Sequence, residues 1–406
     1  MSQRRFLFLA LSRKGWGETS LGLEVARQVC AGGATAAFMA HSGGLSALGG
    51  SGFEVQELPD HMCPFVPFLL EETLNGMSAD AIVLSDIFTA QYTLSRAGIE
   101  ISSLLDFGVP VIGLDTWEYD STGPIIDIFD YEVPIDNWID GLAGRLVPAP
   151  IGRPTSSGAY CALAEPSKVA RSVRRHIRQN LGLTEADRAV LFCTAGWQHS
   201  LGNPAGSRLA SATPELLWRY LQAVDPSVRL IHVGPERLAL PSAEDRYLWM
   251  PSVPPEDFGR LLGSVDLFLS ANISATTVGR AVASGVPTLV VHNSVRADTL
   301  EQVEAAVSGG LSPMVEQWLK GALPIYPFRL WPLGYWRFLE PIMRDNPYCA
   351  AIETVELLDA AQFHSACSQL LFDRPAIAAA RGRQDAYVQT IRRLPSAAQL
   401  INNFLN

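Results

Sequence analysis

The fold is decided by LFLSANISATTVGRAVASGVPTLVV, the stretch from Leu267 to Val291. Its pattern predicts a buried strand at Leu267–Leu269, a loop of small hydroxylated residues, a helix that begins near Thr276, and a second strand at Thr288–Val291. Gly285-Val286-Pro287 separates the helix from the second strand. This strand-helix-strand spacing is typical of a parallel βαβ unit, so we expect a parallel sheet in this half of the chain.

The loop in this stretch has the composition of an anion site. Backbone N–H groups and the positive end of the helix dipole converge where a helix begins, and hydroxyl side chains add donors. The residues that we expect to bind the anion in this loop are Asn272, Ser274, Thr276 and Thr277. Arg280 could reach a phosphate or a sugar carboxylate, or pair with an acidic residue, and we favour the pairing. The stretch predicts a phosphorylated ligand at the carboxyl ends of parallel strands.

Length and composition indicate two folded domains. The chain has 406 residues, of which 48% are hydrophobic and 18% charged. At about 150 residues per domain, this permits two domains with real cores and argues against disorder. The net charge of −10 does not exclude a nucleotide, because local dipoles can bind phosphate. Since no run reaches the roughly 18 apolar residues of a membrane span, we expect no membrane segment.

Two features of the sequence exclude other classes. The basic run RSVRRHIR, Arg171–Arg178, alternates with Val and Ile at helical spacing, so we interpret it as a solvated helix face and expect no nucleic-acid partner. The six cysteines show no CxxC pair. They are typical of reduced core thiols in a cytosolic protein, and we expect no metal site.

The first half of the chain alternates strand and helix, which predicts a doubly wound α/β domain. The expected strands are Phe6–Leu11, Ala34–Ala40, Phe53–Leu58, Asp80–Leu84 and Val109–Leu114, and the expected helices are Thr19–Cys30, Phe65–Asn75 and Ala90–Leu105. The Pro-rich segment Arg145–Pro154 cannot be a helix interior. We place the domain junction between it and Glu165-Pro166.

The alternation then restarts, which predicts a second domain of the same class. The expected strands are Ala189–Cys193, Val228–Val233 and Tyr247–Met250, and the expected helices are Pro214–Val224 and Pro255–Leu262. Two α/β domains in tandem, Rossmann-like and doubly wound, would face each other across a cleft. Leu323–Tyr348 is aromatic and holds five prolines, too many for a regular helix. Its part Tyr326–Trp336 could wall a pocket or form a subunit contact, but we favour buried packing.

Loops after the first domain's strands carry candidate catalytic acids. In SRKGWGETSLG, Ser12–Gly22, Gly15 and Gly17 permit close approach of a ligand, but neither GxGxxG nor GK[ST] is present. Glu18 is either a general base for an acceptor or a carboxylate that complements the helix dipole. Asp115, Glu118 and Asp120 follow another strand and could bind acceptor hydroxyls or a cation. Asp115 is the second candidate base.

The loop TAGWQHSL, Thr194–Leu201, follows the second domain's first expected strand. Gly196 permits close approach, and Thr194, Gln198 and Ser200 supply hydrogen-bond donors. Because the loop lies at the carboxyl end of a parallel strand, we expect it to contact the ligand. His199 could contact a phosphate or be incidental.

Five segments in order resemble the GT-B class of glycosyltransferases and their epimerase relatives. They are GWGETSLGLEVARQV, RLVPAPIGRP, AVLFCTAGWQ, LWMPSVPPEDFGRLLGSVDLFLS and TTVGRAVASGVPTLVV. The resemblance implies an N-terminal acceptor domain at 1–160, a nucleotide-donor domain at 161–385, and a tail, 386–406, that crosses back to the first domain. It also implies an acidic base near Glu18, as in inverting members that include protein-arginine rhamnosyltransferases.

Two positions depart from that class. Members often carry a Glu seven residues before the helix-ending Pro to hold the ribose hydroxyls, whereas this chain has Arg280. A guanidinium cannot accept hydrogens from two hydroxyls. Asn272-Ile273-Ser274 replaces the usual Gly-Gly. The ribose is therefore held differently, or the donor is unusual, or donor binding has been lost.

The resemblance implies a cytosolic, bacterial-type enzyme that moves a sugar from a nucleotide-diphosphate donor to a small-molecule or peptide acceptor. The diphosphate would lie over Ser274, Thr276 and Thr277, with Thr194–Gln198 flanking the sugar, and no metal or further cofactor would be needed. One alternative is an epimerase or tailoring enzyme whose anionic ligand is read by Arg280. Another is a non-catalytic auxiliary protein. A homodimer is left open.

Overall fold

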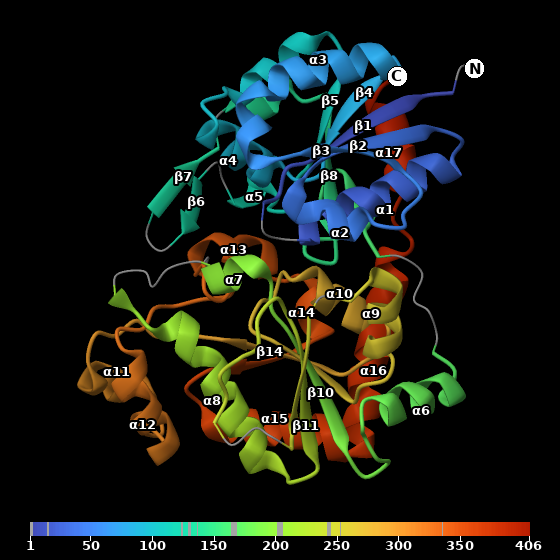
Figure 1. Cartoon of the computed structure of the whole chain (residues 1–406). Coiled ribbons are helices and arrows are strands. Elements are labelled where there is room, and N and C mark those ends of the chain that lie inside the picture. Colours follow the sequence, from blue (N-terminus) through green and yellow to red (C-terminus); the bar gives the residue numbers. More distant parts are fainter. Residues whose placement is uncertain are drawn as a thin grey trace.

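Two parallel β-sheets form the frame of the molecule, as a computed structural model of the chain shows (Figure 1). The model describes residues 3–13, 16–122, 125–128, 131–135, 137–163, 169–200, 206–241, 245–251, 253–334 and 336–406. Gly15, one of the predicted ligand contacts, lies outside the described residues.

The N-terminal sheet has the strand order β3-β2-β1-β4-β5-β8-β9, and all its described pairings are parallel. Its strands are β1 (Arg5–Ala10), β2 (Thr35–His41), β3 (Glu54–Leu58), β4 (Ala81–Leu84), β5 (Val111–Leu114), β8 (Gly144–Ala149) and β9 (Ala159–Cys161). The order reverses beside β1, the arrangement of a doubly wound sheet, whose ligands bind at the carboxyl ends of the strands.

The C-terminal sheet repeats the order of the first six of these strands, as β12-β11-β10-β13-β14-β15, and is also parallel. Its strands are β10 (Arg188–Cys193), β11 (Val228–Val233), β12 (Tyr247–Met250), β13 (Leu267–Ser270), β14 (Thr288–His292) and β15 (Glu353–Glu356). Every residue of β13 and β14 is buried, which explains their nearly continuous apolar sequence. The prediction of two Rossmann-like, doubly wound domains is confirmed.

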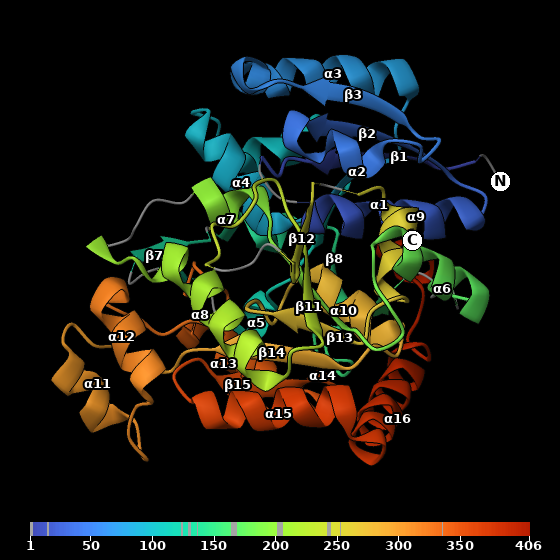
Figure 2. The ribbon, with the colours of Figure 1, turned by 60° about the horizontal axis from the view of Figure 1, so that its bottom comes forward.

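Helices cover both faces of each sheet (Figures 1 and 2). In the first half they are α1 (Gly17–Ala31), α2 (Leu45–Leu48), α3 (Val66–Met77), α4 (Ile87–Arg96), α5 (Tyr119–Thr122) and α6 (Arg171–Asn180). The next are α7 (Gly196–Ser200), α8 (Leu209–Val224), α9 (Pro255–Leu262), α10 (Thr276–Ala283), α11 (Leu300–Ala306) and α12 (Pro313–Ala322). The last are α13 (Trp336–Met343), α14 (Pro347–Ala350), α15 (Ala360–Phe372), α16 (Arg374–Ile391) and α17 (Ala397–Phe404).

Four short 3₁₀ helices and a hairpin complete the described elements. The 3₁₀ helices are η1 (Ser42–Gly44), η2 (Asp60–Phe65), η3 (Ile101–Phe107) and η4 (Asn137–Gly141), and the hairpin pairs β6 (Ile125–Ile128) with β7 (Tyr131–Pro134). The structure describes no helix that is long and apolar enough to cross a membrane.

The C-terminal tail returns to the N-terminal domain, as the resemblance implied. Helix α17 packs against α1 and β8, and its red ribbon lies beside them in Figure 1. Gly144 in β8 makes room for this contact, because a Cβ there would lie 2.3 Å from the ring of Phe404. Arg4 adds hydrogen bonds of 2.9 Å to the side chains of Asn402 and Asn406.

Three predicted elements differ in the structure. The helix expected at Ala90–Leu105 ends at Arg96, because the chain turns at Gly98 with a φ of 76° and continues as η3. Part of the Pro-rich segment 145–154 forms strand β8, whose Pro148 lies near one end of the sheet. Helix α8 begins at Leu209, five residues before the expected start.

The basic helix α6 is only partly a solvated face, so that interpretation was wrong for two of its arginines. Arg174 and Arg178 bind the two carboxylate oxygens of Asp266 at 2.6 and 3.0 Å. Arg178 also donates to the carbonyl oxygen of Asp187 at 2.7 Å. Asp266 lies just before β13, so these two arginines fasten α6 to the C-terminal sheet.

Candidate functional site

The N-termini of α1 and α10 meet between the two domains. Each helix follows the carboxyl end of a central strand, and a Cβ built on Gly17 would lie 3.5 Å from Cγ2 of Thr276. Within the described residues neither helix has a side chain that caps its first turn; the N-cap residues are Trp16 and Ala275. Both positive helix ends therefore face one small region, which Figure 1 shows between the two sheets.

Glu18 lies in the first turn of α1, beside this contact. Its Oε2 atom is buried and has no hydrogen-bond partner among the described residues. Burial raises the pKa of its carboxyl group, and its backbone N–H and the Ser12 hydroxyl offset the shift only in part. A carboxyl group with a raised pKa and an unused oxygen can accept a proton near neutral pH.

Asp86, the N-cap of α4, lies close to Glu18, and we call the two residues the acidic pair. Its Oδ2 atom accepts a hydrogen bond of 2.7 Å from the backbone N–H of Thr89. Burial, and to a lesser extent the Glu18 charge, raise the pKa of Asp86 to about 7. The hydroxyls of Thr19 and Ser85 are also buried, without a hydrogen-bond partner in the described part of the chain.

The raised pKa of Asp86 predicts a pH-dependent effect on stability. A group with a raised folded-state pKa contributes stability below its unfolded pKa of about 3.9 and loses it as the pH rises through its folded pKa. Asp86→Asn keeps a cap for α4 and cannot ionise. We expect it to raise the free energy of unfolding at pH 8 by roughly 1–3 kcal/mol, with little change near pH 4. Urea unfolding at both pH values tests this, and an equal change at both would contradict it.

Asp115, the second candidate base, lies at the carboxyl end of β5 and already has partners. Both carboxylate oxygens lie 3.2 Å from the backbone N–H of Tyr119, and Arg145 lies 3.4 Å from Oδ2. Burial raises the pKa of Asp115 to about 6, although these contacts oppose the shift. Arg145 also binds the exposed Asp120 at 2.6 Å. These contacts orient Asp115 but leave fewer free lone pairs than Glu18 has.

Glu118 belongs to a separate network. Its carboxylate binds Arg153 at 2.8 Å and accepts a hydrogen bond of 2.6 Å from Ser156. The backbone of Glu118 has a positive φ of 47°, a conformation that residues other than glycine seldom adopt. The network ties α5 to the segment after β8, so Glu118 fixes the chain where it leaves the first domain.

The loop before α10 is covered by the aromatic segment. The backbone N–H of Ile273 donates to the Arg329 carbonyl at 3.1 Å, and that of Trp331 donates to the Ala271 carbonyl at 3.1 Å. Phe328 and Trp331 are buried, in agreement with the packing that we favoured for this segment. Asn272 and Ser274 are buried too. Thr276 and Thr277 stay half-buried, so the accessible part of the predicted anion site is the first turn of α10.

Arg280 faces the first domain. Burial and the nearby Arg27 lower the pKa of its guanidinium, and Glu24 opposes this shift. Glu24 and Arg27 both lie on α1. Arg280 is therefore influenced by charges of the first domain, and its pairing with an acidic residue stays a prediction.

The predicted donor loop after β10 uses most of its polar side chains internally. Oγ1 of Thr194 lies 2.8 Å from Nε2 of both His199 and His232. Gln198 accepts from the Ala195 N–H at 2.6 Å and donates to the Trp331 carbonyl at 3.1 Å. Gly196 begins the short helix α7. The sequence offered no signal for the partnership with His232, which is 38 residues away.

A second group that the sequence missed lies at the carboxyl ends of β1–β3. His41, Asp60 and Cys63 place potential ligand atoms within 4.8 Å of one another. Asp60 Oδ1, however, binds Arg13 at 2.5 Å and Nε2 of His41 at 2.6 Å. Nδ1 of His41 accepts from the Gly43 N–H at 3.3 Å, so the neutral ring carries its proton on Nε2. The side chains of His41 and Asp60 are therefore already engaged with each other and with protein partners.

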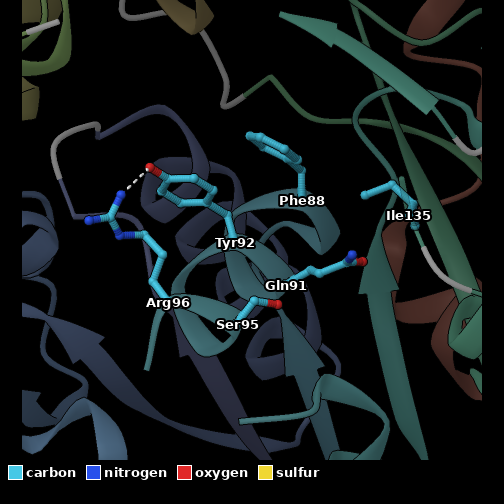
Figure 3. Close-up of a pocket in the computed structure, with 6 residues that line it drawn as sticks. All are labelled: Phe88, Gln91, Tyr92, Ser95, Arg96 and Ile135. Carbon is cyan, nitrogen blue, oxygen red and sulfur yellow. Dashed lines mark hydrogen bonds between the residues drawn. The ribbon is translucent and has the colours of Figure 1, made fainter. Parts of the chain in front are cut away.

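An apolar hollow of about 220 Å³ lies along α4, one turn beyond Asp86 (Figure 3). The rings of Phe88 and Tyr92 stack with centroids 6.0 Å apart, and Arg96 donates to the Tyr92 hydroxyl at 3.0 Å. Gln91 accepts a hydrogen bond of 2.9 Å from the indole of Trp138. The lining residues are Phe88, Gln91, Tyr92, Ser95, Arg96 and Ile135. This hollow could take a planar apolar group.

Two facing, doubly wound domains with a tail that crosses back define the GT-B fold, the fold class of this chain. Solved structures similar to the whole chain include Anabaena Alr3699/HepE in complex with UDP and glucose, at 12% identity, 99% coverage of both chains and a TM-score of 0.57. Another is Arabidopsis thaliana UGT89C1 complexed with UDP-L-rhamnose, at 13% identity, 100% and 98% coverage and a TM-score of 0.57. A third is the spinosyn rhamnosyltransferase SpnG, at 14% identity, 99% coverage of both chains and a TM-score of 0.56.

The chain belongs to the family of unknown function DUF6365, whose model matches residues 25–406. No curated protein matches the sequence. At identities of 12–14% the structural likeness establishes the fold, whereas the activity has to be argued from the site.

Proposed function

We propose that this protein is a glycosyltransferase that moves a sugar from a nucleoside-diphosphate donor to a small-molecule or peptide acceptor. The observation that carries the proposal is the meeting of the α1 and α10 N-termini, with Gly17 against Thr276 and Glu18 beside them. Two helix ends without side-chain caps in the described chain suit a diphosphate, and a carboxylate with a free oxygen suits an acceptor proton.

In this scheme the diphosphate lies at the first turn of α10. The backbone N–H groups and the hydroxyls of Thr276 and Thr277 stabilise the negative charge that develops as the sugar leaves. Glu18 removes the proton from the acceptor hydroxyl or amide, and the acceptor oxygen or nitrogen forms the new bond to the sugar. Such a site works without a metal, so we expect activity to survive EDTA.

The acceptor would lie against α4. Asp86, which opens that helix, feels the charge of Glu18, and Phe88 and Tyr92 follow it on the wall of the hollow in Figure 3. An acceptor with a planar apolar part would stack there while its nucleophilic atom reaches Glu18.

Nucleotide binding tests the donor half of the proposal. We expect one of UDP, dTDP, GDP or ADP, or a matching sugar nucleotide, to raise the melting temperature of the full chain. A free nucleotide concentration of 100 times Kd adds about 2.7 kcal/mol to the free energy of unfolding. Replacing both Thr276 and Thr277 with Val should weaken binding about tenfold or more. Thr35→Val, at the exposed amino end of β2, is the matched control. No shift with any nucleotide would overturn the proposal.

A second candidate function is a non-catalytic auxiliary protein on the same fold. It is favoured by the aromatic segment, which hydrogen-bonds over the loop 271–273 before α10, and by Arg280, which is coupled to α1 instead of offering a ribose carboxylate. This candidate predicts no nucleotide-induced shift and no sugar transfer. The same thermal-shift panel therefore separates the two functions.

A further inference from the structure

A chain of hydrogen bonds leads from the loop after β11 to His199 in α7, and we call it the histidine chain. The Tyr247 hydroxyl accepts from the Leu238 N–H at 3.0 Å and lies 3.0 Å from Nδ1 of His232. Nε2 of His232 lies 2.8 Å from Oγ1 of Thr194. That oxygen lies 2.8 Å from Nε2 of His199. The chain runs from the half-buried backbone amide of Leu238 to the side chain of His199.

In one tautomer of His199 every hydrogen of the histidine chain has a defined position. Glu236 favours this tautomer, because its carboxylate lies 3.7 Å from Nδ1 of His199 and attracts a proton on that atom. With its proton on Nδ1, neutral His199 has a lone pair on Nε2, which accepts the hydroxyl hydrogen of Thr194. Burial lowers the pKa of His232 to about 3, so this ring is neutral, and its Nε2–H donates to the Thr194 oxygen. Nδ1 of His232 then accepts from the Tyr247 hydroxyl, whose oxygen accepts from the Leu238 N–H.

His199 is held as a neutral donor. Burial lowers its pKa, and the Glu236 charge opposes this only in part. Protonation of Nε2 would also cost the hydrogen bond that this atom accepts from the Thr194 hydroxyl. The nearest recorded acceptor for Nδ1–H is a Glu236 oxygen at 3.7 Å, too far for a hydrogen bond. In the described chain this N–H is thus oriented but unused.

His199 lies at the same edge of the C-terminal sheet as the proposed donor site, because β10 and β13 are parallel neighbours that lead to α7 and α10. Helix α7 follows the carboxyl end of β10, and Figure 1 places it at the end of the second domain that faces the first. Thr194 and Gln198, the neighbouring polar side chains of this turn, already have internal partners. Gly234 leaves room for the histidine chain, since a Cβ there would lie 2.1 Å from Oγ1 of Thr194.

We infer that Nδ1–H of His199 donates a hydrogen bond to a phosphoryl oxygen of the nucleoside diphosphate, and that Glu236 and the histidine chain together favour the tautomer that makes this possible. The inference rests on the proposed function, because it names a group that would hold the donor. A phosphoryl oxygen only accepts hydrogen bonds, so it needs the N–H form of this ring atom. Glu236, whose side chain is 72% exposed, can turn aside when the phosphate binds.

The tautomer is measured first, by two-bond ¹H–¹⁵N NMR correlations of the histidine rings in the full chain at pH 7.5. We expect His199 with its proton on Nδ1. Thr194→Val keeps the shape of the side chain but removes both hydrogen bonds, so His199 should become a mixture of tautomers. A wild-type spectrum with the His199 proton on Nε2 would overturn the inference, whatever the outcome of nucleotide binding.

The ligand contact is measured by calorimetric titration with UDP, dTDP and the other diphosphates of the thermal-shift panel. His199→Leu should weaken binding about ten- to hundredfold, the value of a hydrogen bond to a charged group. His199→Asn places an amide N–H near the position of Nδ1 and should stay within about threefold of wild type. Glu236→Gln, which removes a competing negative charge from an exposed position, should tighten binding.

The outcomes separate this inference from the proposed function. If the wild-type chain binds a diphosphate and His199→Leu binds it equally well, the inference is wrong and the proposed function stands. Failure of every nucleotide to bind the wild-type chain overturns the ligand assignment together with the proposed function. A nucleoside that binds as tightly as its diphosphate, with the same loss in His199→Leu, overturns the phosphoryl contact in favour of a hydroxyl.

Discussion

Glu18→Gln is expected to lower the turnover of sugar transfer by about 10²- to 10⁴-fold while nucleotide affinity changes little. Gln keeps the size of the side chain and its hydrogen-bonding oxygen but cannot take a proton at neutral pH. Burial holds the pKa of the Glu18 carboxyl above its usual value, and burial together with the Glu18 charge raises the pKa of Asp86 to about 7. Turnover of the wild-type enzyme should therefore rise with pH through the titration of this pair.

The competing interpretation of Glu18 makes a different prediction. A carboxylate that only complements the α1 dipole would contribute about 0.3–1 kcal/mol of stability, and its replacement would leave turnover intact. Glu301→Gln is a matched control, since Glu301 lies in the first turn of α11 and is exposed. Unchanged turnover in Glu18→Gln would remove Glu18 from the mechanism, whatever the change in stability.

Much of the fold could be predicted from the sequence because its signals are local. The strands β13 and β14 are short apolar runs, and the turn between α10 and β14 depends on Gly285, whose φ is 65°. The helix α9 was predicted at its observed bounds, since Pro254-Pro255 marks its start. Order and spacing of such units then indicate a doubly wound sheet, whose carboxyl edge locates the candidate site.

The parts that could not be predicted depend on contacts between distant residues. The sequence correctly placed Thr194 and His199 after a parallel strand. Only the fold brings His232 to Thr194, whose hydroxyl then bonds to two histidines of the protein. The acidic pair forms because two βα turns of one sheet lie side by side, and Asp86 gave no signal of its own. The aromatic segment covers a loop more than fifty residues earlier in the chain through backbone hydrogen bonds, which leave no trace in side-chain patterns.

The second large effect is expected for Asp266→Ala, which should lower the free energy of unfolding by about 3 kcal/mol or more. Asp266 binds Arg174 and Arg178, and its Oδ2 also accepts a 2.8 Å hydrogen bond from the Ala189 N–H. Only 10% of the Arg178 side chain is exposed, so the variant leaves a buried guanidinium without its counter-ion. Removing one partner of such a pair costs more than the intact pair contributes, because the remaining charge stays desolvated.

Asp257→Ala is the control for this prediction. Its carboxylate pairs with Arg260 at 3.4 Å within α9, and both side chains are 58% exposed. An exposed pair of this kind contributes about 0–1 kcal/mol, so its loss should barely move the urea midpoint. If Asp266→Ala and Asp257→Ala prove equally mild, α6 is held by its carbonyl contacts alone and the arginines add no ion-pair stability.

The position of Asp266 extends this effect to the site. Its bond to Ala189 joins the beginnings of β10 and β13, the two strands whose carboxyl ends lead into α7 and toward α10. Loosening that junction shifts the parallel strands at the end remote from the ligand, so His199 and Thr276 lose part of their fixed spacing. We therefore expect Asp266→Ala to weaken nucleotide affinity in a calorimetric titration at a temperature where the variant remains folded, whereas Asp257→Ala should bind like wild type. Wild-type affinity in a folded but destabilised Asp266→Ala would show that the two strand ends hold their spacing without this anchor.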